Sequence, residues 1–150
     1  MNGNANPFVG SWTYRSLLND ATLATTDPVK DPATWASLFF GYGTIVISEG
    51  GVPEELTGTI GGSGWSLDLH GSMSSGNPGQ ARFQGKGVVS GAEWIYDYIG
   101  WLVPVWPNST NELQARTLVG SIVRTIPHPS GSGGVAPAGV VASWYAVFVK

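Results

Sequence analysis

Turn-forming residues interrupt this chain at short and regular intervals, and that spacing constrains its fold more than any other feature of the sequence. Gly, Pro, Asn and Ser gather in breaks such as 50–53, 61–64 and 76–79. Between the breaks lie short runs in which apolar and polar residues alternate or apolar residues predominate. The predicted strands are 8–16, 43–48, 55–61, 64–72, 80–88, 93–103, 116–126 and 140–149.

Most connections between these strands are too short for crossovers, so sequential strands should pair as antiparallel neighbours. About eight such strands close into an up-and-down barrel whose interior holds side chains or one small ligand. Closure also removes the exposed edges that an open sheet would present. We therefore expect one all-β domain over residues 1–150, an eight-stranded antiparallel up-and-down β-barrel.

The stretch between the first two predicted strands is the longest irregular segment of the chain. Asp31 followed by Pro32 is typical of a helix start, because Asp caps free backbone N–H groups and Pro fits the first turn. A helix there would place Trp35, Leu38 and Phe39 on its apolar side. We expect a long loop or a short helix here, placed as a lid or plug.

The composition excludes several classes of protein. Charged residues make up only 11% of the chain, while its 150 residues include 22 Gly and seven Trp. Disordered chains are rich in charge and poor in aromatics, and helix interiors disfavour Gly, so neither disorder nor a helical bundle fits. The net charge is −3 and the seven cations form no run, which argues against nucleic-acid and membrane-surface partners.

Several absences in the sequence bear on compartment and on metal chemistry. The chain has no Cys, which excludes disulfides, thiolate metal sites and cysteine nucleophiles. Asp68 and His70 share one strand face, but no third metal ligand has a useful spacing. The N-terminal residues do not resemble a secretory signal, and no apolar run reaches the length of a membrane helix. We expect a cytoplasmic protein with no metal and no cofactor.

The first predicted strand contains the tripeptide Gly10-Ser11-Trp12. It resembles the G-x-W signature of the calycin superfamily, which includes lipocalins, fatty-acid-binding proteins and avidins. The resemblance implies a calycin-like barrel that binds a ligand in its lumen. It also implies a Trp at the closed end of the barrel, packed near an Arg from a late strand. Arg116 and Arg124 are the candidates for that Arg, with Arg124 preferred.

Aromatic residues recur on strand faces that could point inward. Tyr and Trp combine apolar surface with a hydrogen-bonding tip, which suits a small, mostly hydrophobic organic ligand in the lumen. Such residues also fill the core of a closed barrel, so each of them could serve packing instead. The candidate ligand-binding residues are Trp12, Tyr14, Trp65, Phe83, Trp94, Tyr96, Tyr98 and Trp144.

An acid–base site is the alternative interpretation. Asp97 lies within an aromatic run, and Glu93 lies on the same strand face. A carboxyl group in apolar surroundings has a raised pKa and can act as a general acid or base. The protein would then be a cofactor-free cyclase or isomerase for a polyketide-, terpenoid- or fatty-acid-derived substrate. Asp97 could instead pair with Arg116 or Arg124, and His128 in its loop is either a further candidate base or a solvated side chain.

The last three predicted strands are apolar on both faces, so the sequence does not say which face lines the lumen. In 93–103, for example, Trp94, Tyr96 and Tyr98 share one face while Ile95 and Ile99 lie on the other. A strand that is apolar on both faces is usually covered on both. We expect the outer face to be covered by a second copy in a homodimer or larger oligomer, or by the segment around position 35.

Overall fold

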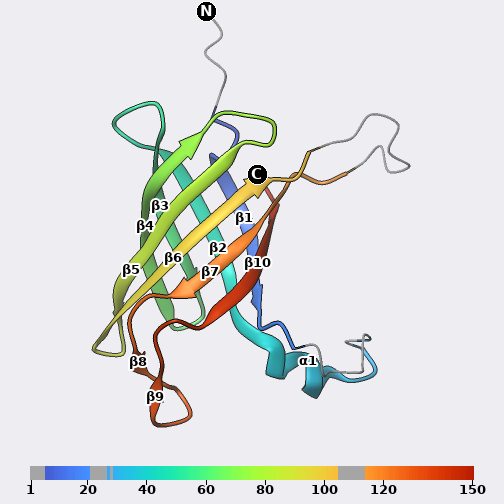
Figure 1. The fold of residues 1–150 in the computed structure, drawn as a ribbon, viewed down its shortest axis with the longest axis vertical. Helices are drawn as coiled ribbons and strands as arrows, with labels where there is room; N and C mark the ends of the chain where they lie inside the picture. The colour runs from blue at the N-terminus through green and yellow to red at the C-terminus, as the bar shows by residue number, and fades with distance from the viewer. Residues whose placement is uncertain (1–5, 21–26, 28, 105–113) are drawn as a thin grey trace, which may run out of the picture.

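The computed structural model describes residues 6–20, 27, 29–104 and 114–150, and its main feature is a closed barrel of eight antiparallel strands (Figure 1). Around the barrel the strands follow the order β1-β10-β7-β6-β5-β4-β3-β2. The sequence-based expectation of an all-β, eight-stranded antiparallel barrel is therefore confirmed. The strands are β1 Gly10–Leu17, β2 Phe39–Glu49, β3 Glu55–Gly62, β4 Trp65–Ser74, β5 Gln80–Val89, β6 Ala92–Leu102, β7 Thr117–Arg124 and β10 Val141–Phe148.

Two features of the strands differ from expectation. β2 begins at Phe39, earlier than the predicted start at position 43, because its first residues pair with the end of β1 as far as Leu17. A small hairpin lies between β7 and β10 and was not predicted. Its strands, β8 (His128–Pro129) and β9 (Val135–Ala136), have two residues each. It projects from the same end of the barrel as the only helix of the described residues (Figure 1).

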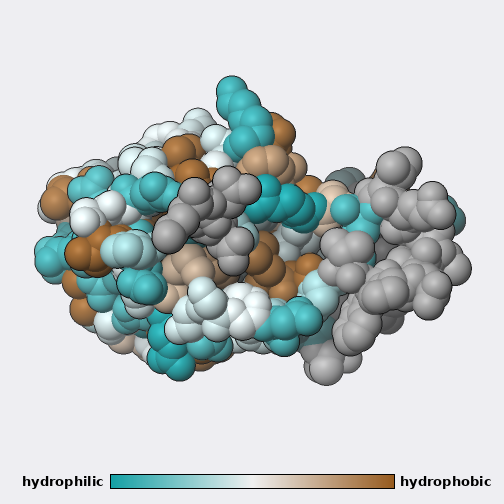
Figure 2. Space-filling model, turned by 90° about the horizontal axis from the view of Figure 1, so that it is seen from above, coloured by the Kyte–Doolittle hydropathy of each residue, from teal (hydrophilic) through white to brown (hydrophobic). Residues whose placement is uncertain are grey.

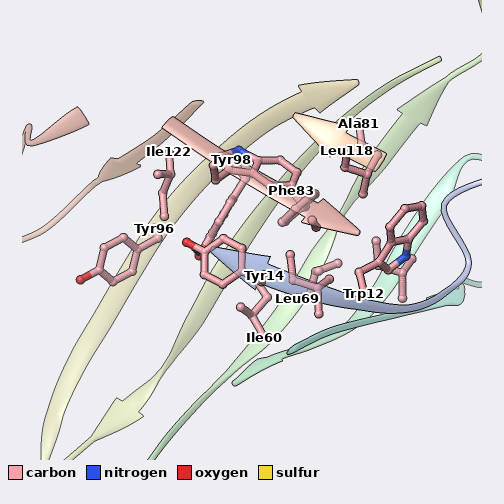
Figure 3. Close-up of a cluster of buried hydrophobic side chains, with 14 of the residues drawn as sticks. Trp12, Tyr14, Ile60, Leu69, Ala81, Phe83, Tyr96, Tyr98, Leu118 and Ile122 are labelled. Carbon is pink, nitrogen blue, oxygen red and sulfur yellow. Dashed lines mark hydrogen bonds between the residues drawn. The ribbon is translucent and has the colours of Figure 1, made fainter. Parts of the chain in front are cut away.

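The structure decides which face of the late strands points inward. In β6 the buried positions are Tyr96, Tyr98 and Gly100, while Glu93 and Trp101 are exposed. This is the period of two that a strand imposes on its side chains. The same alternation buries Ala142, Trp144 and Ala146 of β10. Figure 3 shows inward side chains from several strands meeting in the barrel.

One end of the barrel is closed around Trp12. Its indole Nε1 donates a hydrogen bond to the carbonyl of Phe8 at 2.9 Å, and both side chains are fully buried. The guanidinium of Arg116 lies 5.5 Å from the Trp12 ring and 4.3 Å from the Phe148 ring. Figure 2 looks onto this end and shows apolar residues interleaved with hydrophilic ones.

The Arg that packs against Trp12 is therefore Arg116, and the preference for Arg124 was wrong. Antiparallel pairing explains the difference. Arg116 stands just before β7, at the end of the barrel where β1 begins, whereas Arg124 is the last residue of β7 at the opposite end. There its guanidinium lies 4.8 Å from the Phe40 ring.

Trp144 fills the middle of the barrel because β6, the second strand from its own, carries a glycine beside the indole. A Cβ on Gly100 would lie 2.5 Å from Cζ2 of the Trp144 indole, closer than packed carbons approach. The indole Nε1 lies within hydrogen-bond distance of the carbonyls of Ile99 (3.2 Å) and Ser121 (3.0 Å). The largest aromatic side chain thus replaces the missing side chain of its neighbour and has its polar atom satisfied.

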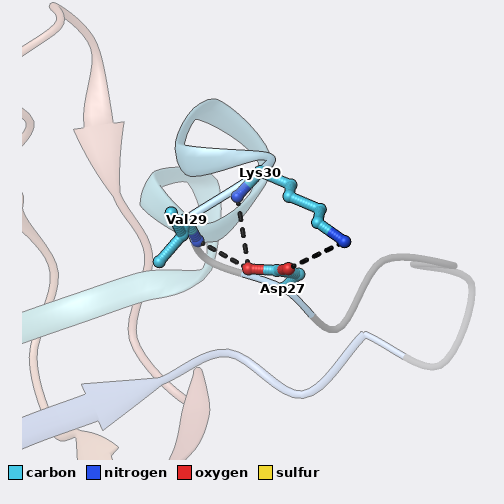
Figure 4. Close-up of polar contacts among 3 residues, drawn as sticks. All are labelled: Asp27, Val29 and Lys30. Carbon is cyan, nitrogen blue, oxygen red and sulfur yellow. Dashed lines mark hydrogen bonds and ion pairs between the residues drawn. The ribbon is translucent and has the colours of Figure 1, made fainter.

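The segment between β1 and β2 contains α1 (Pro32–Leu38), a short helix of the expected kind. Asp31 caps it by accepting a hydrogen bond from the backbone N–H of Thr34 at 3.2 Å, and Pro32 opens the first turn. The turn before it is held by Asp27, whose carboxylate accepts from the backbone N–H groups of Val29 and Lys30 (Figure 4). Local capping therefore defines this helix.

The helix does not cover the barrel as one of the two alternatives proposed. No residue of α1 is buried, and Phe39 is not on the helix but starts β2, 43% exposed. On the outer face of the late strands Tyr145 and Trp101 stay 41% and 38% exposed, so the segment around Trp35 does not bury them. Cover by a second copy stays a prediction. Within the described ranges, no helix has the length and hydropathy to span a membrane.

Candidate functional site

Side chains fill most of the lumen. Phe83 stacks on Tyr98 with ring centroids 4.8 Å apart, and Trp144 packs edge-on against both of these rings. Trp12 lies beyond them at the closed end, in edge contact with Phe148. Of the candidate ligand-binding residues, Trp12, Phe83 and Trp144 thus belong to the packed core, which is the role that a closed small barrel gives most inward aromatics.

A cavity of about 170 Å³ remains at the end of the lumen opposite Trp12. Aromatic rings supply most of its wall, and the helix and the β8–β9 hairpin lie at this end of the barrel (Figure 1). The lining residues are Tyr14, Phe40, Gly41, Trp65, Leu67, Trp94, Tyr96, Tyr98 and Ile122.

Five of the eight residues predicted to bind ligand line this cavity, from the three strands β1, β4 and β6: Tyr14, Trp65, Trp94, Tyr96 and Tyr98. The sequence-based selection missed Phe40, Leu67 and Ile122. Leu67 and Ile122 could have been found, because both stand at inward positions of alternating strands. Phe40 could not, because the early start of β2 was not recognised.

The volume limits what the cavity can hold. A dry engineered cavity of about 150 Å³ accommodates benzene, whereas pockets for drug-sized ligands have roughly 300–1,000 Å³. With about 170 Å³ the cavity matches the size of a single substituted ring.

Two phenol hydroxyls meet at the inner end of the cavity. The Oη atoms of Tyr14 and Tyr98 are 3.5 Å apart, with Tyr98 as donor, and both side chains are almost completely buried. Figure 3 shows both hydroxyls on the side of the rings that faces Tyr96. Burial raises the pKa of Tyr14 to about 12 and that of Tyr98 well above its usual value, because an apolar site disfavours the phenolate.

A second polar group stands at the outer rim of the cavity. The Tyr96 hydroxyl lies 2.6 Å from Nε2 of His128, and Nε of Arg124 donates to the same hydroxyl at 3.3 Å. The His128 ring also stacks on Trp94, with centroids 4.0 Å apart. His128 is buried, so it is not the solvated loop residue that the sequence left as one possibility.

The hydrogen-bond partners decide which nitrogen of His128 carries the proton. Nδ1 lies 2.9 Å from the carbonyl of Pro129, which can only accept, so Nδ1 is the donor. In the neutral ring Nε2 is then an acceptor, and the Tyr96 hydroxyl donates to it. The polar chain runs from Arg124 through Tyr96 to His128, with each donor matched to an acceptor.

The two carboxylates proposed as catalytic do not face the cavity. In β6, Glu93 and Asp97 alternate with the inward Tyr96 and Tyr98 and lie on the outer face of the barrel. Because a substrate in the lumen is on the other side of the sheet, neither carboxylate can reach it. The structure thus gives no positional support for an acid–base role of Asp97 and Glu93 inside the barrel.

Other contacts account for both carboxylates. Asp97 accepts hydrogen bonds from Nε2 of Gln84 at 3.0 Å and from the Thr125 hydroxyl, rather than pairing with Arg116 or Arg124. It lies in an open groove of about 570 Å³ on the barrel wall. Glu93 is exposed and lies 3.9 Å from Nζ of Lys86.

His70, which the sequence placed on one strand face with Asp68, makes a contact with Glu55 at the surface. His70 Nε2 lies 2.8 Å from a carboxylate oxygen of Glu55 on the neighbouring strand. This contact holds the pKa of Glu55 below its usual value. Across the described residues, no group of three or more His, Cys, Asp or Glu side chains is arranged to hold a metal ion.

Comparisons of the chain with protein-family models, with curated proteins and with solved structures find no match. Function therefore has to be inferred from the cavity itself: its volume, its aromatic wall, the paired hydroxyls at its inner end and the polar chain at its rim.

Proposed function

We propose that this barrel binds a small, mostly hydrophobic organic molecule, about the size of one substituted ring, in the cavity at the Tyr96 end. The observation that carries the proposal is an aromatic-walled space of about 170 Å³ in a lumen that is otherwise filled. Closed small barrels usually pack their interior completely, so an apolar space of this size costs stability unless it is used. Rings of Trp65, Trp94 and Tyr96 offer faces and edges for aromatic contact.

We also propose that the barrel is calycin-like. The support for this is the meander of eight strands together with the packing of Trp12 against Arg116 at the closed end. Both features agree with what the Gly10-Ser11-Trp12 resemblance implies. A ligand bound at the opposite end of the lumen fits that arrangement.

Titration with toluene tests the proposal, because toluene fills a one-ring cavity without needing a polar partner. We expect saturable binding by calorimetry. Substituting Ile122→Trp places a larger side chain in the cavity and should weaken toluene binding at least tenfold. Ile122→Leu conserves volume and serves as the matched control, with circular dichroism to verify that both variants fold. Absence of saturable binding, or equal binding by the Trp variant, would contradict the proposal.

The rim favours a second candidate, a cofactor-free isomerase. Tyr96 lines the cavity and donates to His128 Nε2 at 2.6 Å, which is the geometry of a relayed general base. A proton from a carbon next to a substrate carbonyl would pass to Tyr96 Oη while the phenol proton passes to His128. This transfer leaves the substrate as an enolate and His128 as an imidazolium, and the reverse transfer returns the proton through Tyr96 to the substrate carbon and restores both neutral groups.

Deuterium exchange tests this second candidate without knowledge of the natural substrate. Acetophenone has one ring and acidic protons beside its carbonyl, so NMR in D₂O can follow their replacement. The isomerase candidate requires exchange faster than in buffer, with at least a tenfold loss in His128→Gln. Exchange at the buffer rate, or exchange that the variant retains, would eliminate it in favour of simple binding.

A further inference from the structure

We infer that the inner end of the cavity is a recognition site for a neutral hydroxyl group, so that the ligand is a single-ring phenol or an alcohol of similar size. The inference rests on the proposed function and specifies its ligand. It is carried by the hydroxyls of Tyr14 and Tyr98, which line the cavity from β1 and β6, and by the Ser16 hydroxyl, which is hydrogen-bonded to Tyr14.

The phenol pair is built into the core, but the hydrogen bond between its two hydroxyls is long. Tyr14 is 1% exposed and Tyr98 is 4% exposed, so bulk water does not complete their hydrogen bonds. Their mutual contact of 3.5 Å is long for two hydroxyls, which normally approach to about 2.7–2.8 Å. Buried polar groups are usually fully hydrogen-bonded. A ligand hydroxyl that bridges these two oxygens from the cavity would therefore improve the hydrogen bonding of both.

The hydrogen-bond donors and acceptors around the two phenol oxygens determine which ligand group fits beside them. The Ser16 hydroxyl contacts both the carbonyl of Gly41, at 3.2 Å, and the Tyr14 hydroxyl. Its one proton goes to the carbonyl, which can only accept, so Ser16 Oγ accepts the proton of Tyr14. Tyr98 directs its proton toward Tyr14 at the longer distance. Lone pairs therefore remain on both phenol oxygens, and the weakly held Tyr98 proton can turn to a new acceptor. A ligand hydroxyl both donates and accepts, so it matches this pair better than a group that only accepts or only donates.

The same surroundings disfavour a charged ligand. Burial raises the pKa of both phenols, and the cost of charge that this reflects would apply equally to a carboxylate bound beside them. None of the side chains that line the cavity is cationic. The nearest guanidinium, that of Arg124, lies at the rim and directs Nε to Tyr96 and Nη1 to the carbonyl of Pro137. A neutral hydroxyl satisfies the inner oxygens without this cost.

Binding of phenol, toluene and benzoate to the wild-type chain and to Tyr98→Phe tests the inference. Phenol and toluene differ in their own hydration, so the informative quantity is the change in affinity on substitution. We expect Tyr98→Phe to weaken phenol about fivefold or more and to leave toluene within about twofold. Tyr42→Phe, which removes an exposed hydroxyl of β2, is the matched control and should change neither.

Each outcome has a distinct meaning. Equal weakening of phenol and toluene by Tyr98→Phe would show a packing effect and would overturn the hydroxyl site, while the proposed function stands. Benzoate that binds as tightly as phenol, and loses affinity in Arg124→Gln, would overturn it in favour of anion binding at the rim. Failure of toluene to bind the wild-type chain would instead contradict the proposed function itself.

Discussion

At the scale of single residues, the pairing of Gly100 with Trp144 shows how a small residue permits a large one. Substituting Gly100→Ala would place a Cβ 2.5 Å from the indole, so the ring or the strand must move. Overpacking of this kind costs about 1–3 kcal/mol of folding free energy. Urea unfolding should show that loss. An unchanged midpoint would mean that the indole does not occupy the space beside Gly100.

The raised pKa of Tyr14 predicts how the free energy of unfolding depends on pH. This pKa is about 12 in the folded chain, against about 10 in an unfolded one. Below about pH 10 the Tyr14 hydroxyl keeps its proton in both the folded and the unfolded chain, so the free energy of unfolding has its full value. As pH rises from about 10 through 12 the unfolded chain loses its proton first, so about 2–3 kcal/mol of stability is lost. Tyr98 acts in the same direction.

Urea midpoints at pH 8, 10 and 11.5 measure this effect. The wild-type chain should lose stability steeply above about pH 10, and Tyr14→Phe should reduce the slope because its ring has no proton to lose. Tyr42→Phe, on an exposed side chain of β2, is the control for general alkaline effects. Identical slopes for wild type and Tyr14→Phe would contradict the assigned burial of the Tyr14 hydroxyl.

At the scale of elements, the rim hydrogen bond ties the β8–β9 hairpin to β6. Tyr96→Phe removes the donor to His128 and leaves a buried nitrogen unsatisfied, which costs about 1–3 kcal/mol. Amide exchange in the hairpin should accelerate, and the urea midpoint should fall. Tyr42→Phe, on an exposed side chain of β2, should change neither. A stable Tyr96→Phe variant would show that stacking on Trp94 alone holds the hairpin.

The helix α1 should behave as a local unit. Asp31→Ala removes its cap, which costs about 1 kcal/mol of helix stability. Because no residue of α1 is buried, the global free energy of unfolding should change by less than about 0.5 kcal/mol. Amide exchange within Pro32–Leu38 should accelerate several-fold. A full kcal/mol lost from global stability would show that the helix packs into the fold.

Elements were predictable where the local pattern determines them. Turn residues and alternation located all eight barrel strands, and Asp31 with Pro32 located the helix. The hairpin of β8 and β9 was not predictable, because two-residue strands have no periodicity. The start of β2 at Phe39 was missed for a related reason: pairing with β1 extends it past residues whose own pattern favours a helix.

At the scale of the whole molecule, the candidate site was only partly predictable. Alternation shows which aromatics share a strand face, and it made Trp65 an inward candidate. For the strand of Trp94 and Tyr96, which is apolar on both faces, the structure had to decide which face is inward. It cannot tell a cavity wall from a packed core, because that depends on how facing side chains fill the volume between strands. Trp144 occupies the core since Gly100 leaves it room, which is a relation between distant positions.

The outer face of β6, β7 and β10 makes a prediction about assembly. Tyr145, Trp101 and Val141 are exposed there, on strands that are apolar on both sides. We expect a second copy to cover this face, giving a homodimer in size-exclusion chromatography with light scattering. Tyr145→Glu should shift the dimer toward monomer, while Thr13→Glu on β1 serves as the control. A wild-type monomer at all concentrations would contradict this expectation.

The central claim is that a one-ring ligand occupies the cavity at the Tyr96 end of an otherwise packed barrel. The indole N–H signals of the Trp residues in a two-dimensional NMR spectrum test it most directly, because they report from both ends of the lumen and from its outside. Titration with phenol should shift the signals of Trp65 and Trp94 saturably and leave those of Trp12 and Trp101 in place. Shifts confined to Trp101 on the outer face, or no saturable shift of Trp65 and Trp94, would contradict the claim.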